Sequence, residues 1–279
     1  MKIFHNFHPE DVKSYDTQRL RKEFFEPDLF VEGQIRIIYS HIDRIVALGV
    51  CPKDQPLALN DVIDAKAFGT DYFLQRRELG IINLGGKTEV KTKDDVFILD
   101  YLDALYLGKE SEDIVFTALE PQQQNALYCL SAPAHHKFAN QLITQQQAKK
   151  VALGSQINAN QRVINQYLHP DVVETCQLCM GITHLAEGSV WNTMPAHTHL
   201  RRMEVYLYFN IKPEQVVFHF LGEPEQTRHI VVRDKQLVFS PSWSIHSGCG
   251  TQNYSFIWGM IGENQTFDDM DFVDMNKIC

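Results

Sequence analysis

Short apolar runs follow one another along almost the whole chain, and this succession strongly limits the folds open to it. Examples are Gln34–Tyr39, Ile114–Leu119 and Glu204–Phe209, each rich in β-branched or aromatic residues and followed by polar turn residues. Many short strands at regular spacing are typical of antiparallel sandwiches and jelly rolls. The sequence therefore predicts an all-β chain with a few short helices.

The two halves of the chain resemble each other, as two diverged copies of one structural unit would. The paired segments are Ser40–Asp43 with Thr183–Ala186, Arg76–Ile82 with Arg201–Leu207 (offset by one residue), and Tyr101–Gly108 with Phe239–Gly248. This repeat predicts two fused jelly-roll β-barrels.

Composition changes along the chain place the boundaries of the predicted parts. The first 30 residues have a partial apolar stripe of helical spacing that includes Leu20 and Phe24. A glutamine- and lysine-rich stretch with few apolar residues separates the two series of strands. We predict an N-terminal helical arm at 1–30, a first barrel at 31–139, a connector at 140–170 and a second barrel at 171–279.

The second half contains a candidate metal site. His197 and His199 are two residues apart, so an extended strand would point both imidazoles to one face. Glu204 lies at an odd separation from both, and a bend or bulge at 200–203 would be needed to turn its carboxylate toward them. A further histidine, His246, follows an apolar strand and the turn Ser240–Pro241–Ser242–Trp243.

Three imidazoles and one carboxylate suit zinc, iron, manganese, cobalt or nickel, and ligand type alone does not choose among them. An isolated His-x-His pair is more often a pair of solvated or hydrogen-bonded side chains than a metal site. The added glutamate and the later histidine favour the metal. This pattern resembles the cupin superfamily, although Trp243 stands where cupins usually carry glycine.

The first half lacks the corresponding ligands. Tyr72–Phe73 occupies the position expected for His-x-His, and no histidine lies within 103–109. We therefore predict that the first barrel is metal-free and structural.

Charge and cysteine usage narrow the possible partners and the location. The net charge of −9 disfavours nucleic acid, which requires a basic surface. The six cysteines are scattered and do not form a disulfide framework. The N-terminal sequence MKIFHNFHPED has no cationic segment followed by an apolar one, so we expect no signal peptide, and no apolar run reaches the length of a membrane span. We expect a cytoplasmic protein with no membrane partner.

Other residues near the motif allow two interpretations of their role. Arg201 and Arg202 could bind a substrate carboxylate through their planar guanidinium groups or form structural ion pairs, and Arg162 is a further carboxylate candidate. Trp243 could form part of the cavity wall. The acidic segment 267–271 more often indicates a solvated tail than a second metal site.

The whole chain resembles the 5-keto-4-deoxyuronate isomerase family (4-deoxy-L-threo-5-hexosulose-uronate ketol-isomerase), whose second motif includes the tryptophan. The segments that carry the resemblance are SHIDRIV (40–46), YFLQRRELGIINLGG (72–86), DALYLGK (103–109), APAH (132–135), PDVVETCQL (170–178), WNTMPAHTH (191–199), RRMEVY (201–206), SPSWSIHSG (240–248) and GENQTFDDMD (262–271).

The resemblance implies a bicupin that binds one Zn²⁺ per subunit through His197, His199, Glu204 and His246, commonly as a homohexamer. It implies conversion of 5-dehydro-4-deoxy-D-glucuronate, a small anionic sugar, to 3-deoxy-D-glycero-2,5-hexodiulosonate through a metal-stabilised enediolate. The general base remains open among Glu174, Tyr167 and a metal-bound hydroxide. The alternatives are an iron-dependent cupin dioxygenase and a non-catalytic sugar-binding bicupin.

Overall fold

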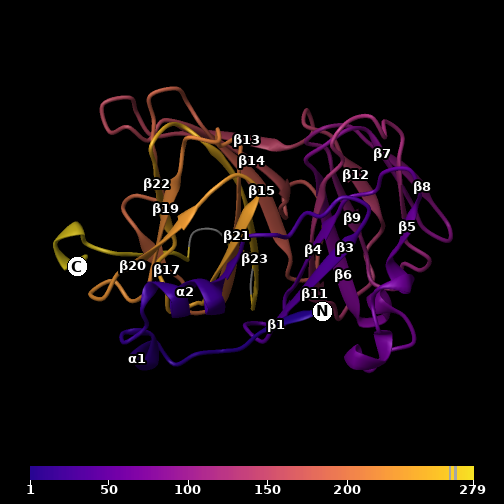
Figure 1. The fold of residues 1–279 in the computed structure, drawn as a ribbon, viewed down its shortest axis with the longest axis horizontal. Helices are drawn as coiled ribbons and strands as arrows, with labels where there is room; N and C mark the ends of the chain where they lie inside the picture. The colour runs from indigo at the N-terminus through magenta and orange to yellow at the C-terminus, as the bar shows by residue number, and fades with distance from the viewer. Residues whose placement is uncertain (264, 267–268) are drawn as a thin grey trace. The chain divides into compact units, whose positions relative to one another are not determined.

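The apolar runs form antiparallel strand pairs in both halves of the sequence (Figure 1). This computed structural model describes residues 1–263, 265–266 and 269–279. The described residues divide into two units, each with its own sheets. The first unit contains Met1–Ile3, Leu29–Ala148 and Tyr167–Cys179, and the second unit contains Phe4–Asp28, Lys149–Gln166 and Met180–Cys279.

The first unit is built from two sheets. The larger sheet has seven strands in the order β1 (Lys2–Phe4), β3 (Ile35–Ser40), β4 (Val46–Val50), β11 (Leu127–Pro133), β6 (Arg77–Asn83), β9 (Ala104–Leu107) and β12 (Gln141–Ile143). The smaller sheet has the order β5 (Leu57–Ala58), β10 (Val115–Ala118), β7 (Thr88–Lys91) and β8 (Val96–Leu99).

Alternate residues of these strands form the core of the first unit. Leu79 and Ile81 of β6 are fully buried with Val90 of β7 and Phe116 of β10 in one apolar cluster. Residues two apart on a strand share a face, so each strand directs one row of apolar side chains inward. Burial of each such side chain contributes about 1.5–3 kcal/mol relative to exposure, and this burial holds the two sheets together.

The second unit repeats this plan. Its larger sheet has the order β13 (Lys149–Leu153), β14 (Arg162–Leu168), β15 (Cys179–Leu185), β23 (Ser255–Gly262), β18 (Arg202–Phe209), β21 (Gln236–Ser240) and β2 (Phe25–Glu26). Its smaller sheet has the order β16 (Trp191–Asn192), β22 (Ser247–Gly250), β19 (Val217–Leu221) and β20 (Arg228–Val232), and a separate two-stranded sheet joins β17 (His197–Thr198) to β24 (Asp271–Phe272).

The two strand orders correspond. Five neighbouring strands of each larger sheet correspond in their order along the chain and in their pairing order. They are β3, β4, β11, β6, β9 in the first unit and β14, β15, β23, β18, β21 in the second. The prediction of an all-β chain with two jelly-roll units is confirmed, and so is the presence of a few short helices.

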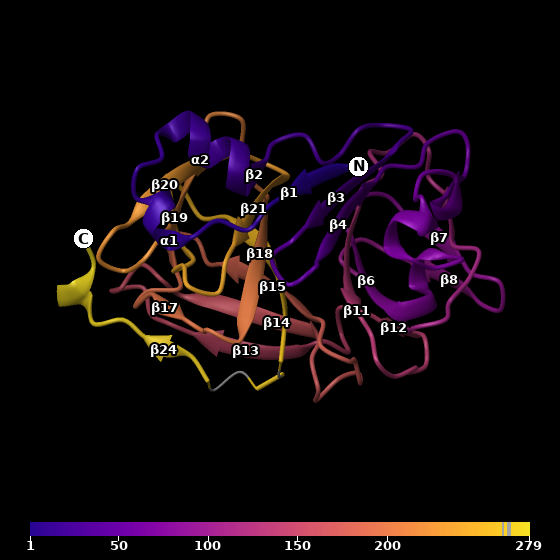
Figure 2. The same cartoon turned by 90° about the horizontal axis from the view of Figure 1, so that it is seen from below.

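Helical structure is confined to short segments. The α-helices are α1 (Pro9–Val12) and α2 (Thr17–Phe24), and the 3₁₀ turns are η1 (Leu59–Asp61), η2 (Ala65–Phe68), η3 (Phe73–Arg76) and η4 (Met275–Lys277). The Asp16 side chain caps α2 by accepting a hydrogen bond from the Arg19 N–H. This helix lies beside β20 and β21 in both views (Figures 1 and 2). No helix in the described part of the chain has the length and apolar character of a transmembrane span.

A buried glutamate holds residues 176–178 within the first unit. Glu78 lies on β6 and is fully buried. Its carboxylate accepts hydrogen bonds from the backbone N–H groups of Cys176, Gln177 and Leu178, at 2.7, 2.9 and 2.9 Å, and from the Tyr106 hydroxyl at 2.9 Å. Because a buried carboxylate is stable only when it is well hydrogen-bonded, these four donors fix the course of the chain before β15.

Candidate metal centre

Local backbone structure brings Glu204 to the two histidines of the His-x-His motif. His197 lies on β17 and pairs with Phe272 of β24. A turn follows, in which the Arg202 N–H donates to the His199 carbonyl at 3.2 Å. The chain then enters β18, where Glu204 is the third residue. The turn provides the change of direction that the odd sequence separation requires.

The fourth member of the cluster comes from the turn that follows β21. Within this turn the Ser244 N–H donates to the Pro241 carbonyl at 2.9 Å. The Ser244 hydroxyl accepts from the Gly222 N–H at 2.8 Å and donates to the Ile245 carbonyl at 2.7 Å. These bonds fix the segment that directs the His246 imidazole inward, where it is 1% exposed.

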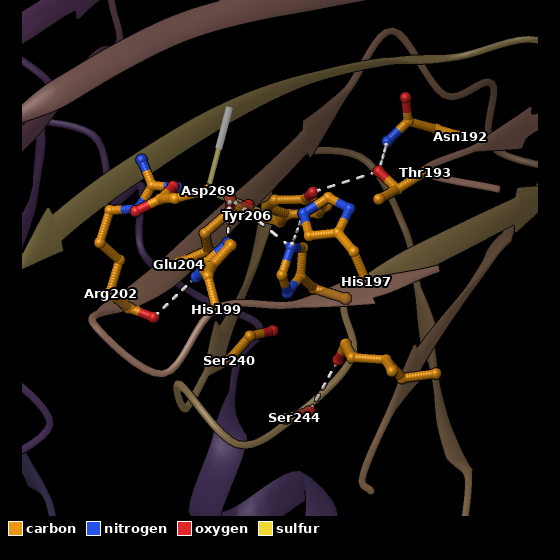
Figure 3. Close-up of polar contacts among 12 residues, drawn as sticks. Asn192, Thr193, His197, His199, Arg202, Glu204, Tyr206, Ser240, Ser244 and Asp269 are labelled. Atoms are coloured by element: carbon orange, nitrogen blue, oxygen red, sulfur yellow. Dashed lines mark hydrogen bonds and ion pairs between the residues drawn. The ribbon is translucent and has the colours of Figure 1, made fainter. Parts of the chain in front are cut away.

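The four side chains form one cluster, of which Figure 3 labels His197, His199 and Glu204. One candidate ligand atom from each of His197, His199, Glu204 and His246 lies within 4.8 Å of the others, and all four residues are buried. The Nε2 atoms of His197 and His246 are 2.9 Å apart. Glu204 Oε1 lies 3.1 Å from His199 Nε2 and 3.6 Å from His246 Nε2.

The environment sets the protonation states of the cluster. Burial lowers the pKa of His197 to about 3 and that of His246 to about 4. Burial alone would raise the pKa of Glu204, but the charge of His246 and the hydrogen bond from His199 lower it below its ordinary value. At neutral pH the site therefore offers an ionised carboxylate and at least two neutral imidazoles. Metal ions bind these forms.

A hydrogen bond to the backbone orients the His199 ring for metal binding. Its Nδ1 lies 2.9 Å from the Arg202 carbonyl, so Nδ1 carries the proton and donates it. This leaves Nε2 as the atom that faces the cluster. Burial would lower the pKa of His199, but its hydrogen bond to Glu204 and the charge of that carboxylate outweigh burial and raise it. A hydrogen bond from the second ring nitrogen is the usual support of a metal-binding histidine.

The residues fit a divalent metal ion. Glu204 Oε2 is buried and has no hydrogen-bond partner among the residues that the structure describes. Such an atom is costly unless something cationic or protic satisfies it. When metal–ligand bonds are about 2.0–2.1 Å long, adjacent ligand atoms lie about 3 Å apart. The separations of 2.9, 3.1 and 3.6 Å given above are close to this value.

A cavity of about 290 Å³ in the second unit includes three of the four cluster residues in its wall. Apolar side chains such as Phe256, Trp258 and Met260 form much of the wall. A mostly apolar cavity with a few convergent polar groups is typical of a small-molecule site.

The residues predicted to bind substrate differ in whether they line this cavity. Arg162 and Arg202 both line the cavity. Trp243 is half-buried and is not among its lining residues. Arg202 is buried and donates from Nη2 to Asp269 (Figure 3). Arg201 Nη1 lies 4.0 Å from the same carboxylate. The contact with Asp269 favours the ion-pair reading for Arg202. Part of the acidic segment, Phe267 and Asp268, lies outside the described residues.

Tyr206 is buried and also lines the cavity, and it was not among the site residues predicted from the sequence. Its hydroxyl lies 3.4 Å from the Thr193 hydroxyl, which also accepts from the Asn192 amide (Figure 3). The available signal was its place two residues after Glu204, on the same face of the strand. Of the proposed bases, Glu174 and Tyr167 belong to the first unit and do not line this cavity.

Comparisons with known proteins agree with this architecture. Residues 37–275 match the model of the KduI/IolB family. The chain is 51% identical to a 4-deoxy-L-threo-5-hexosulose-uronate ketol-isomerase of Lachnoclostridium phytofermentans, with 97% of each chain covered. It is 50% identical to the enzyme of the same name from Pectobacterium carotovorum subsp. carotovorum, with 99% of each covered.

Among solved structures, an IolB-like protein from Salmonella typhimurium superposes with a TM-score of 0.71 at 16% identity, covering 91% of this chain and 97% of that one. At that identity the likeness concerns the fold alone. The match to the family model covers most of the chain, and relatives near 50% identity span nearly its full length. The chain therefore belongs to the KduI/IolB family.

Proposed function

We propose that this protein is a zinc-dependent ketol-isomerase that converts 5-dehydro-4-deoxy-D-glucuronate to 3-deoxy-D-glycero-2,5-hexodiulosonate. The buried cluster of His197, His199, Glu204 and His246 beside a cavity of small-molecule size carries the proposal. The relatives that share about half of its residues along their full length are named for this activity. A homohexamer in the cytoplasm belongs to the same proposal, and light scattering of the purified protein tests the assembly.

The bound metal ion would supply Lewis-acid stabilisation of the negative charge that develops on the C1 and C2 oxygens. The reaction moves a proton from C2 to C1 and turns an aldose into a ketose. Tyr206 lines the cavity and is buried, and burial raises the pKa of its hydroxyl well above the ordinary value. The phenol is therefore neutral at pH 7, and it can donate a hydrogen bond to a substrate oxygen.

Arg162 is suited to bind the substrate carboxylate. Its Nη1 donates to the Asn160 carbonyl at 2.9 Å, which fixes the guanidinium against the chain. Its Nε is buried and has no hydrogen-bond partner among the described residues. A guanidinium that faces a cavity with donors to spare binds carboxylates well, because its planar fork matches two oxygens.

Metal removal is the test of the proposed function. Purified protein should contain about one zinc per chain, and prolonged chelation should abolish turnover of 5-dehydro-4-deoxy-D-glucuronate. Added zinc should restore turnover, because the apo-protein keeps its fold. Metal content is measured by mass spectrometry and the fold by circular dichroism.

Each of the other possible outcomes would support a different function. Full turnover by metal-free protein would exclude a metal-dependent isomerase. Bound iron together with oxygen consumption and no isomerisation would favour the dioxygenase. Absence of both metal and turnover would favour a binding bicupin.

Replacement of Arg162 by glutamine should raise KM by about 10-fold or more while kcat changes less. The reason is that a charge-assisted hydrogen bond to a remote carboxylate contributes about 1.5–3 kcal/mol to substrate binding in both the ground and transition states. Steady-state kinetics on the metal-loaded variant measures this. Arg233→Gln removes an exposed arginine of the same unit and is the matched control. An unchanged KM in Arg162→Gln would assign the carboxylate to another group.

A further inference from the structure

A second cavity, of about 500 Å³, lies in the first unit. It lies at the ends of strands of the larger sheet, where β3 ends and β6 begins. Tyr39 pairs with Val46, and Arg77 pairs with Pro133, at these strand ends. Its wall includes His41, Arg44, Arg76 and Arg77. Among the described residues that line it, none is an aspartate or glutamate. In a chain of net charge −9, this is a local concentration of positive charge.

Arg77 is the buried member of this group and is 6% exposed. Its Nε donates to the Ser131 hydroxyl at 3.0 Å, and its Nη2 donates to the carbonyls of Arg44 and Ser131 at 2.7 and 2.8 Å. All of these acceptors are neutral. Nη1 has no hydrogen-bond partner within the described part of the chain. Among the described residues, the charge of Arg77 is therefore held in place by neutral acceptors and not by an ion pair.

The adjacent carboxylate forms no hydrogen bond with Arg77 among the described contacts. Neighbouring residues on a strand point to opposite faces, and Glu78 is engaged by three backbone N–H groups and the Tyr106 hydroxyl. Burial lowers the pKa of Arg77 to about 10, the nearby charge of Arg44 acts in the same direction, and the charges of Tyr39 and Glu78 oppose this shift without reversing it. The guanidinium nevertheless stays protonated at neutral pH.

The second unit provides an internal comparison. Arg202 is the first residue of β18, as Arg77 is of the corresponding strand β6, and both are buried. Arg202 forms an ion pair with Asp269. No acidic residue that the structure describes forms an ion pair with Arg77, Arg44 or Arg76. The described part of the first unit thus keeps the buried arginine without an ion pair like that of Arg202, and a bound anion would fill that role.

The aromatic part of the cavity wall suits a ligand of the size of a sugar. Tyr39 and Phe68 both line the cavity, with ring centroids 5.9 Å apart in an edge-to-face arrangement. Aromatic walls with a few fixed polar groups are typical of small-molecule sites. The Arg77 guanidinium also lies 5.7 Å from the Phe68 ring centroid, which holds the charge beside the aromatic wall.

We propose that this cavity is a second ligand site, which binds a monosaccharide-sized anion through its carboxylate or phosphate group. Arg77 provides the fixed donor at the base, and the exposed Arg44 and Arg76 close on the anion from the rim. The aromatic pair packs against the body of the sugar. This site does not depend on the metal cluster or on the reaction proposed for it.

Calorimetric titration of the full chain tests the site with three probes: D-glucuronate, glucose 6-phosphate and uncharged glucose. At least one of the two anions should bind with a dissociation constant below about 1 mM, and glucose should not. The anion that binds identifies the carboxylate or the phosphate as the recognised group. The double variant Arg44→Gln/Arg76→Gln should weaken this binding at least about ten-fold, because charge-assisted hydrogen bonds are lost.

Two controls separate this site from other effects. Lys53→Gln/Lys93→Gln removes two exposed positive charges of the same unit outside the cavity, and it should retain the binding. Arg162→Gln alters the cavity of the second unit and should retain it too. Absence of binding by both anions would overturn the proposal. So would binding that survives in Arg44→Gln/Arg76→Gln but is lost in Arg162→Gln.

Discussion

Replacement of Glu204 by glutamine is expected to remove the bound metal and to lower kcat by more than about 100-fold. Loss of a residue that merely orients a ligand lowers metal affinity or activity roughly 10- to 100-fold, and Glu204 belongs to the cluster itself. Glutamine keeps the size of the side chain but removes the only negative charge among the four residues. It also replaces an acceptor oxygen with an NH₂ group that cannot bind a cation.

Metal content and steady-state turnover of Glu204→Gln, measured on the same preparation, check this expectation. The matched control is Glu187→Gln, which makes the same chemical change at an exposed position of the second unit. Circular dichroism should be the same for both variants and the unmodified protein. Stoichiometric metal together with unimpaired turnover in Glu204→Gln would contradict the assignment of the cluster as the metal site.

Replacement of Glu78 by glutamine is expected to lower the free energy of unfolding by about 3 kcal/mol or more, with little direct effect on the metal cluster. Hydrogen bonds to a charged acceptor each contribute about 1.5–3 kcal/mol, and Glu78 accepts four. A glutamine amide would direct N–H groups toward backbone N–H groups in a buried site. The carboxylate also raises the pKa of Tyr106, together with burial, as expected for a phenol that donates to it.

Urea unfolding of a graded set of variants measures the effect. Tyr106→Phe removes one of the four donors and should cost about 1.5–3 kcal/mol, less than Glu78→Gln. Glu32→Gln breaks an exposed ion pair with Lys53 and should cost at most about 1 kcal/mol. If Glu78→Gln were no more destabilising than Glu32→Gln, the carboxylate would not be what holds residues 176–178.

The local sequence pattern was sufficient to predict the strands and much of the metal cluster. Alternation and β-branched runs predicted the strand content, since side chains two residues apart share a face whatever the rest of the chain does. The same rule placed His197 and His199 together, and the repeat of strand segments predicted two similar units. Sequence separation also showed that Glu204 required a bend, and the structure has a turn there.

Contacts between distant parts of the chain could not be predicted in this way. The Arg202–Asp269 ion pair joins residues 67 positions apart, and the bond between Glu78 and Gln177 spans 99. No local periodicity records which distant strand or turn will be adjacent, because adjacency depends on the path of the whole chain through its sheets.

For this protein, sequence alone determined the all-β architecture, its duplication and the residue types able to bind a metal ion. Tertiary structure alone decided which polar groups share a cavity, because burial and hydrogen bonding depend on all the strands that surround a side chain. It placed Tyr206 in the wall of the metal cavity and left Trp243 out of it. It also left Arg77 buried without an ion pair among the described residues, whereas Arg202, at the matching position of the other unit, forms one with Asp269.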